Sequence, residues 1–120
     1  MMWVRVGSVL MFLGVGLGAF GAHALKSRLS PEMLAVFETG VRYHFYHALG
    51  LLFVGWLSHT RPSPTIDWAG WAFLAGVVVF SGSLYLLSVS GVRWLGAITP
   101  IGGLAFLGGW LLVALSTLRG

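Results

Sequence analysis

Cysteine is absent from this chain, and charged residues are scarce. Without cysteine there are no disulfides and no thiolate metal sites, and the redox compartment stays undetermined. Only 8% of the 120 residues are charged and 58% are hydrophobic, whereas a soluble domain carries about 25% charged residues. That leaves too little polar surface to coat a water-soluble globule. The composition therefore predicts an integral membrane protein.

Recognisable catalytic sets are lacking as well. The sequence contains no Ser-His-Asp set, Walker loop, zincin motif or paired carboxylates, and its acidic residues are Glu32, Glu38 and Asp67. Four membrane spans of about 20 residues would use about 80 residues, so only short loops remain and a soluble catalytic domain does not fit. We therefore expect one membrane domain over residues 1–120 that is not an enzyme and holds no cofactor and no metal ion.

The apolar runs predict an all-α fold, an integral membrane bundle of four transmembrane helices with a short interfacial amphipathic helix between the first two spans. The predicted spans cover residues 6–24, 41–58, 68–89 and 95–118, and the interfacial helix covers residues 31–39. Ser30 as N-cap and Pro31 at the first helical position predict where that helix begins. A secretory signal peptide is an alternative interpretation of the first run, because a small-x-small pattern closes it.

The basic residues outnumber the acidic ones by seven to three, which gives a formal net charge of +4. They are single and spread along the chain, so we expect membrane lipids with anionic headgroups as partners, and no nucleic acid. Four spans place three basic residues at the end with both termini and four at the other end, which favours termini outside the cytoplasm. The three are Arg5, Arg61 and Arg119, and the four are Lys26, Arg28, Arg42 and Arg93.

Glycine is abundant, with 18 residues, and in lipid small residues let helices approach each other closely. Gly14 and Gly18 form a small-residue ladder with Ala22, which we interpret as a packing groove, with the lining of a passage as the alternative. Pro100 is expected to kink the fourth span, and Thr99 is a candidate to satisfy the carbonyl of Gly96 that the kink frees.

The most informative polar group is a candidate cluster at the start of the second span. Glu38 and Arg42 are spaced for an ion pair on one helix edge, while the imidazoles lie on another face. Ionisable groups at membrane depth suggest function, and structural anchoring, ligand or proton handling, and metal or haem binding all stay open. The cluster consists of His23, Glu38, Arg42, His44 and His47.

His47 is expected to be the deepest of these ionisable residues. We predict that it is neutral, buried between helices and hydrogen-bonded to another span, since lipid cannot satisfy an imidazole. The candidate partners are Ser81, Ser83, Tyr85 and carbonyls near Gly96.

Four sequence blocks together resemble the YgdD-like family of small membrane proteins. They are GAFGAHAL at residues 18–25, FETGVRYHFYHAL at 37–49, FSGSLY at 80–85 and RWLGAITPIGG at 93–103. The resemblance covers nearly the whole chain. It implies a four-helix protein of the bacterial inner membrane and supplies no activity, cofactor or functional residues.

Two functions are consistent with these features. The leading hypothesis is a non-enzymatic membrane protein with a packing, accessory or assembly role, acting as a homo-oligomer or in a larger membrane complex. The alternative is a small transporter or channel that handles protons or an anion through the His/Arg cluster of the first two spans.

Overall fold

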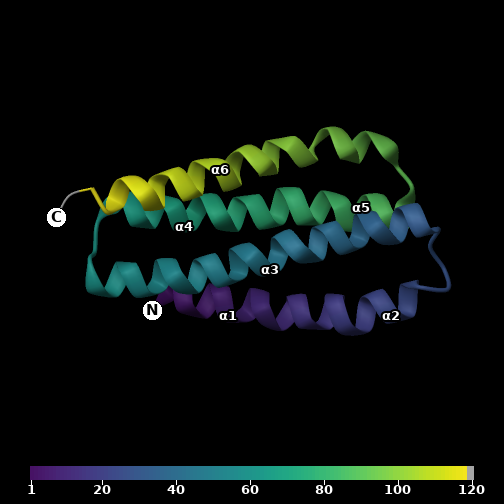
Figure 1. The fold of residues 1–120 in the computed structure, drawn as a ribbon, viewed down its shortest axis with the longest axis horizontal. Coiled ribbons are helices and arrows are strands. Elements are labelled where there is room, and N and C mark those ends of the chain that lie inside the picture. Colours follow the sequence, from purple (N-terminus) through teal and green to yellow (C-terminus); the bar gives the residue numbers. More distant parts are fainter. Residues whose placement is uncertain (119–120) are drawn as a thin grey trace.

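The computed structural model describes residues 1–118, which form four long helical rods lying side by side (Figure 1). The first rod is built from α1 (Met2–Val15), a π-helical segment η1 (Gly16–Gly21) and α2 (Ala22–Leu25). The second is α3 (Pro31–Thr60). The third joins α4 (Pro64–Gly76), a second π-helical segment η2 (Val77–Ser81) and α5 (Gly82–Ser90). The fourth is a short 3₁₀ helix, η3 (Arg93–Ala97), followed by α6 (Thr99–Ser116).

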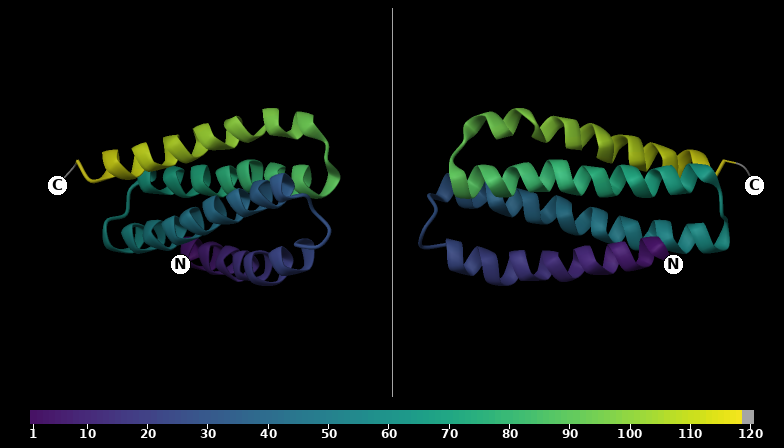
Figure 2. Two further views of the ribbon diagram at one scale, coloured as in Figure 1. Left: turned by 45° about the vertical axis from the view of Figure 1, so that its right-hand side comes forward. Right: turned by 180° about the vertical axis from the view of Figure 1, so that it is seen from behind.

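Successive rods run in opposite directions, so the start of α1 and the end of α6 lie at the same end of the bundle (Figures 1 and 2). Here this end is called the terminal end, and the end with the loops at residues 26–30 and 91–92 is called the loop end. The rod α3 lies between the first rod and the other two. It forms hydrogen bonds with each of the other three rods.

The helix starts follow the capping signals of the sequence. Ser30 Oγ accepts a hydrogen bond from the Met33 N–H at 3.1 Å, and Pro31 opens α3 as predicted. The expected interfacial helix at residues 31–39 is not a separate element, because α3 continues without a break to Thr60. Gly40 stays helical at the expected junction, where it packs against the ring of Tyr85.

Three of the described helical rods are long and apolar enough to cross a membrane, rather than the four predicted. They are Met2–Leu25, Pro64–Ser90 and Arg93–Ser116, which correspond to the expected spans 6–24, 68–89 and 95–118. The expected second span, 41–58, lies within α3. Arg42 and two Tyr-His pairs in its first turns lower its apolar character below that of the other rods.

The kink expected at Pro100 falls at the junction of two helices and not inside a continuous one. Pro100 stands in the first turn of α6, directly after the 3₁₀ helix η3. A proline fits the first turn because the N–H it lacks would have no helical partner there. Thr99 Oγ1 lies 2.6 Å from Ser83 Oγ and so joins the start of α6 to α5.

The first rod is an integral part of the bundle, which favours a structural span over the signal-peptide interpretation. Trp3 is only 2% exposed and lies in the core cluster with Leu51, Ile66 and Phe73. Its Nε1–H donates a hydrogen bond to Asp67 Oδ1 at 3.2 Å. This tryptophan therefore ties α1 to α4.

Many glycines are used for contacts inside the bundle. A Cβ on Gly14 would lie 3.0 Å from the Phe45 ring, and one on Gly18 would lie 3.1 Å from Val41 Cγ1. Both glycines therefore let the first rod approach α3 closely. At Gly102 the neighbour is backbone, since a Cβ would lie 2.8 Å from Phe80 Cα.

Candidate functional site

The five residues of the predicted cluster occupy two different environments. His44 and His47 are buried, with 3% and 4% of their surfaces exposed. His23, Glu38 and Arg42 are exposed. Within residues 1–118 no three His, Asp or Glu side chains gather as a metal site would require. The sequence cluster is therefore not one site in space.

His44 connects α3 to two other rods. Its Nε2 lies 2.6 Å from the Leu10 carbonyl oxygen of α1, and its Nδ1 lies 2.8 Å from the Tyr85 hydroxyl of α5. A carbonyl only accepts, so Nε2 carries the proton, and in the neutral ring Nδ1 accepts from the Tyr85 O–H. His44 is thus the Nε2–H tautomer.

His47 connects α3 to the fourth rod with the opposite tautomer. The Trp110 Nε1–H of α6 donates to His47 Nε2 at 2.9 Å, and His47 Nδ1 donates to the Tyr43 carbonyl at 2.8 Å. Indole N–H is a donor only, so Nε2 must be unprotonated and the ring neutral. The Phe106 ring stacks on the imidazole, with centroids 3.5 Å apart and planes 7° apart.

The predicted environment of His47 is confirmed, but its predicted partners are wrong. It is buried and hydrogen-bonded to another rod, as expected, yet the partner is Trp110. Of the expected partners, Tyr85 binds His44, and Ser81 Oγ donates to the Gly40 carbonyl at 2.7 Å. Each of these bonds joins α3 to another rod. Trp110 is therefore the partner that the sequence did not predict, whereas Tyr85 was predicted for His47 and binds His44 instead.

The buried polar side chains of the bundle are hydrogen-bonded. Among the described residues, no buried side-chain nitrogen or oxygen lacks a hydrogen-bond partner. All four ring nitrogens of His44 and His47 are engaged by protein groups. Both histidines therefore bond to other helices in this structure, with no ring nitrogen left for a ligand.

The predicted ion pair between Glu38 and Arg42 is not formed, although the two residues are one turn apart. In the part of the chain that the structure describes, the salt bridge is Arg93 Nη1 to Glu32 Oε1 at 3.7 Å, at the loop end. An exposed ion pair is worth little because it costs side-chain entropy. Glu38 and Arg42 therefore present their charges outward.

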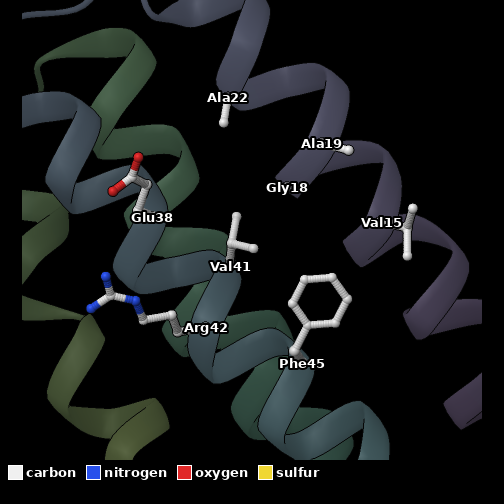
Figure 3. Close-up of a pocket in the computed structure, with 8 residues that line it drawn as sticks. All are labelled: Val15, Gly18, Ala19, Ala22, Glu38, Val41, Arg42 and Phe45. Carbon is white, nitrogen blue, oxygen red and sulfur yellow. The ribbon is translucent and has the colours of Figure 1, made fainter.

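Their charges border a groove between the first rod and α3, drawn in Figure 3 and here called the α1–α3 groove. One wall consists of Val15, Gly18, Ala19 and Ala22, and the other of Glu38, Val41, Arg42 and Phe45. A second groove lies between α3 and α6 and is lined mainly by aromatic and aliphatic side chains, with an edge of His47 at its floor. Both grooves open on the outer surface of the bundle.

Comparison with known proteins identifies relatives along almost the whole chain. The family model described as "Protein of unknown function (DUF423)" matches residues 17–103. The UPF0382 membrane protein SH2409 of Staphylococcus haemolyticus is 48% identical over 98% of this chain and 96% of its own length. The UPF0382 membrane protein YwdK of Bacillus subtilis is 45% identical over the same shares.

No solved structure matches the chain. The relatives are bacterial membrane proteins, and with three apolar rods the chain is a multi-pass membrane protein, as expected. They carry the UPF0382 name rather than the YgdD-like name suggested by the four sequence blocks. The chain belongs to the DUF423 family of UPF0382 membrane proteins, a family of unknown function.

Proposed function

We propose that this protein is a four-span, non-enzymatic membrane protein with an accessory or assembly role, which binds its partners from its outer surface. The observation that carries this proposal is that all four ring nitrogens of His44 and His47 are hydrogen-bonded inside the bundle, three of them in bonds that hold α3 against three neighbouring rods. Because these buried polar groups are already hydrogen-bonded within the bundle, partner proteins would bind to its outer surface.

The fourth span in this proposal is α3. Its 30 residues extend about 45 Å at 1.5 Å per residue, more than the about 30 Å of a bilayer core. It lies along three rods that are apolar enough to span (Figure 1), so it must share their depth. The central position also explains its composition, because hydrogen-bonded polar side chains such as His44 face protein rather than lipid.

Single-cysteine labelling tests this topology, since the chain has no cysteine of its own. If α3 crosses the bilayer, Ser27→Cys and Pro62→Cys lie on opposite sides. An impermeant maleimide added to sealed vesicles should then label only one of the two variants. Ser90→Cys is the matched control, because it lies at the same end as Ser27 and should label from the same side. Labelling of Ser27→Cys and Pro62→Cys from one side would show that α3 does not cross.

The accessory role predicts association within the membrane. Chain released in native nanodiscs and weighed by native mass spectrometry should appear as a homo-oligomer or in complex with another membrane protein. A chain that is strictly monomeric and without a protein partner under these conditions would contradict the role.

The alternative, a transporter or channel for protons or an anion, requires a water-filled path past the histidines. The engagement of every ring nitrogen of His44 and His47 counts against it, since proton transfer would break a bond between helices. Proteoliposomes should therefore show no proton or chloride flux above empty vesicles. A flux that His47→Leu abolishes would favour the transporter instead.

A further inference from the structure

The α1–α3 groove combines an apolar floor with two opposite charges. Its floor is closed by the contact of Gly18 with Val41, and Phe45 continues the apolar wall toward the middle of the bundle (Figure 3). The groove volume of about 520 Å³ lies in the range of small-molecule sites, about 300 to 1,000 Å³. The groove can therefore hold an elongated apolar group with a polar head.

The two charges are arranged along the groove in a fixed order. Glu38 and Arg42 stand four residues apart on one face of α3, which places their Cα atoms about 6 Å apart along the axis. Glu38 is nearer the loop end, and the Arg42 guanidinium points away from the first rod, on the same side of α3 as the Glu38 carboxylate (Figure 3). The two side chains form no salt bridge with each other, in contrast to Arg93 and Glu32. Both charges are thus available to a ligand.

Leaving Glu38 and Arg42 unpaired costs free energy if the two side chains lie within the membrane. From the start of α3 at Pro31, Glu38 lies about 10 Å and Arg42 about 16 Å along the helix. If the roughly 15 Å by which α3 exceeds the bilayer core is shared between both ends, Arg42 starts below the headgroup boundary. Arginine at that depth extends its side chain toward phosphates at the interface. At that depth Arg42 is expected to attract an anion, and no described acidic side chain pairs with it.

We propose that the α1–α3 groove binds a phospholipid whose headgroup carries a primary amine, as in phosphatidylethanolamine. The Arg42 guanidinium holds the phosphate, for which its planar donors are suited. The Glu38 carboxylate accepts hydrogen bonds from the ammonium group. One acyl chain lies along the apolar wall formed by Val41 and Phe45.

The order of the charges selects this lipid class over others. In a phospholipid the phosphate lies next to the glycerol and the amine lies beyond it, toward water, which matches Arg42 below Glu38. A choline headgroup has the same charge order but no N–H to donate to the Glu38 carboxylate. An anionic headgroup such as phosphatidylglycerol places no positive charge beside Glu38.

Lipid retention measured by native mass spectrometry tests the proposal. The purified full chain is equilibrated in micelles with equal amounts of phosphatidylethanolamine, phosphatidylcholine and phosphatidylglycerol of the same acyl chains. Phosphatidylethanolamine should be retained about tenfold more than either competitor, since hydrogen bonds to charged groups are worth roughly that factor. Equal retention of the three lipids would overturn the proposal.

Matched variants separate the two charges. Arg42→Gln should reduce phosphatidylethanolamine retention about tenfold, whereas Arg93→Gln, an exposed arginine outside the groove, should leave it unchanged. Glu38→Gln should remove the preference over phosphatidylglycerol, because the neutral amide of glutamine does not attract the ammonium group. If Arg42→Gln and Arg93→Gln behave alike, Arg42 does not hold the phosphate and the proposal fails.

A variant that keeps both charges tests the groove itself. Ala19→Trp fills the groove from the first rod and should lower retention, while Val9→Trp, on the exposed surface of α1, should not. A groove covered by a second copy of the chain in every lipid mixture, seen as a dimer that Ala19→Trp dissociates, would overturn the proposal. The inference rests on α3 crossing the bilayer, which the cysteine labelling tests without any lipid measurement, so the two can fail separately.

Discussion

His44 and His47 lie three residues apart on α3 and hold opposite tautomers. His44 donates through Nε2 to the Leu10 carbonyl, and His47 donates through Nδ1 to the Tyr43 carbonyl. The remaining nitrogens accept from Tyr85 and Trp110. The sequence predicted a buried, hydrogen-bonded imidazole for His47, because lipid offers it no partner. It could not name the partners, since these depend on how the neighbouring rods are rotated.

The bond between Trp110 and His47 should stabilise the bundle. Trp110→Phe keeps an aromatic ring but leaves His47 Nε2 without a donor, so unfolding in detergent should become easier by about 1 to 2 kcal/mol. Trp56→Phe, on the exposed side of α3, should cost less.

The pair is isolated by a double-mutant cycle in which unfolding is followed in the same detergent. His47→Leu and Trp110→Phe combined should cost less than the sum of the two single variants, with a coupling energy of about 0.6 to 1.7 kcal/mol. Additive losses would mean that the hydrogen bond contributes nothing beyond packing.

Among the elements, α6 separates glycines that are needed for packing from glycines that are not. Gly102 faces the third rod, where an added Cβ would lie 2.8 Å from Phe80 Cα. Backbone cannot move aside as a flexible side chain can. Gly108, on the same helix, has no atom within 4 Å of such a Cβ. The same substitution should therefore have opposite effects at the two positions.

Gly102→Ala should lower the free energy of unfolding by about 1 to 3 kcal/mol, because the third and fourth rods must separate to admit the methyl group. Gly108→Ala should be neutral or stabilising by up to about 1 kcal/mol, the helix propensity that alanine gains over glycine. Thermal unfolding of both variants in one detergent gives the comparison. A loss at Gly108 as large as that at Gly102 would show that α6 is packed differently.

The element boundaries show what local sequence can and cannot predict. Ser30 and Pro31 set the start of α3, since a cap acts within its own turn. The predicted interfacial helix runs on through Gly40 into the second span, where Gly40 packs against Tyr85 despite the weak helix propensity of glycine. The π-helical segments η1 and η2 carry no sequence signal of this kind. They lie between α-helical stretches whose ends are held by packing against other rods.

At the scale of the whole molecule, the basic residues at its two ends determine its expected orientation in the membrane. The loop end carries Lys26, Arg28 and Arg93, and Arg42 lies about 16 Å along α3 from that end. The terminal end carries Arg5 and Arg61, and Arg119, counted with them, lies outside the described residues. The loop end therefore carries four basic residues and the terminal end three. By the positive-inside rule, the loop end lies in the cytoplasm by a margin of one charge.

An orientation decided by one charge should reverse when two are removed from the loop end. Lys26→Gln with Arg28→Gln leaves two basic residues against three, so the termini should move to the cytoplasmic side. Arg5→Gln changes the balance to four against two and should keep the termini outside. Paired fusions of alkaline phosphatase, active only outside, and green fluorescent protein, fluorescent only inside, to the C-terminus measure the outcome. If the double variant and Arg5→Gln give the same reporter ratio, loop charges do not orient this protein, and the insertion of its first rod must do so.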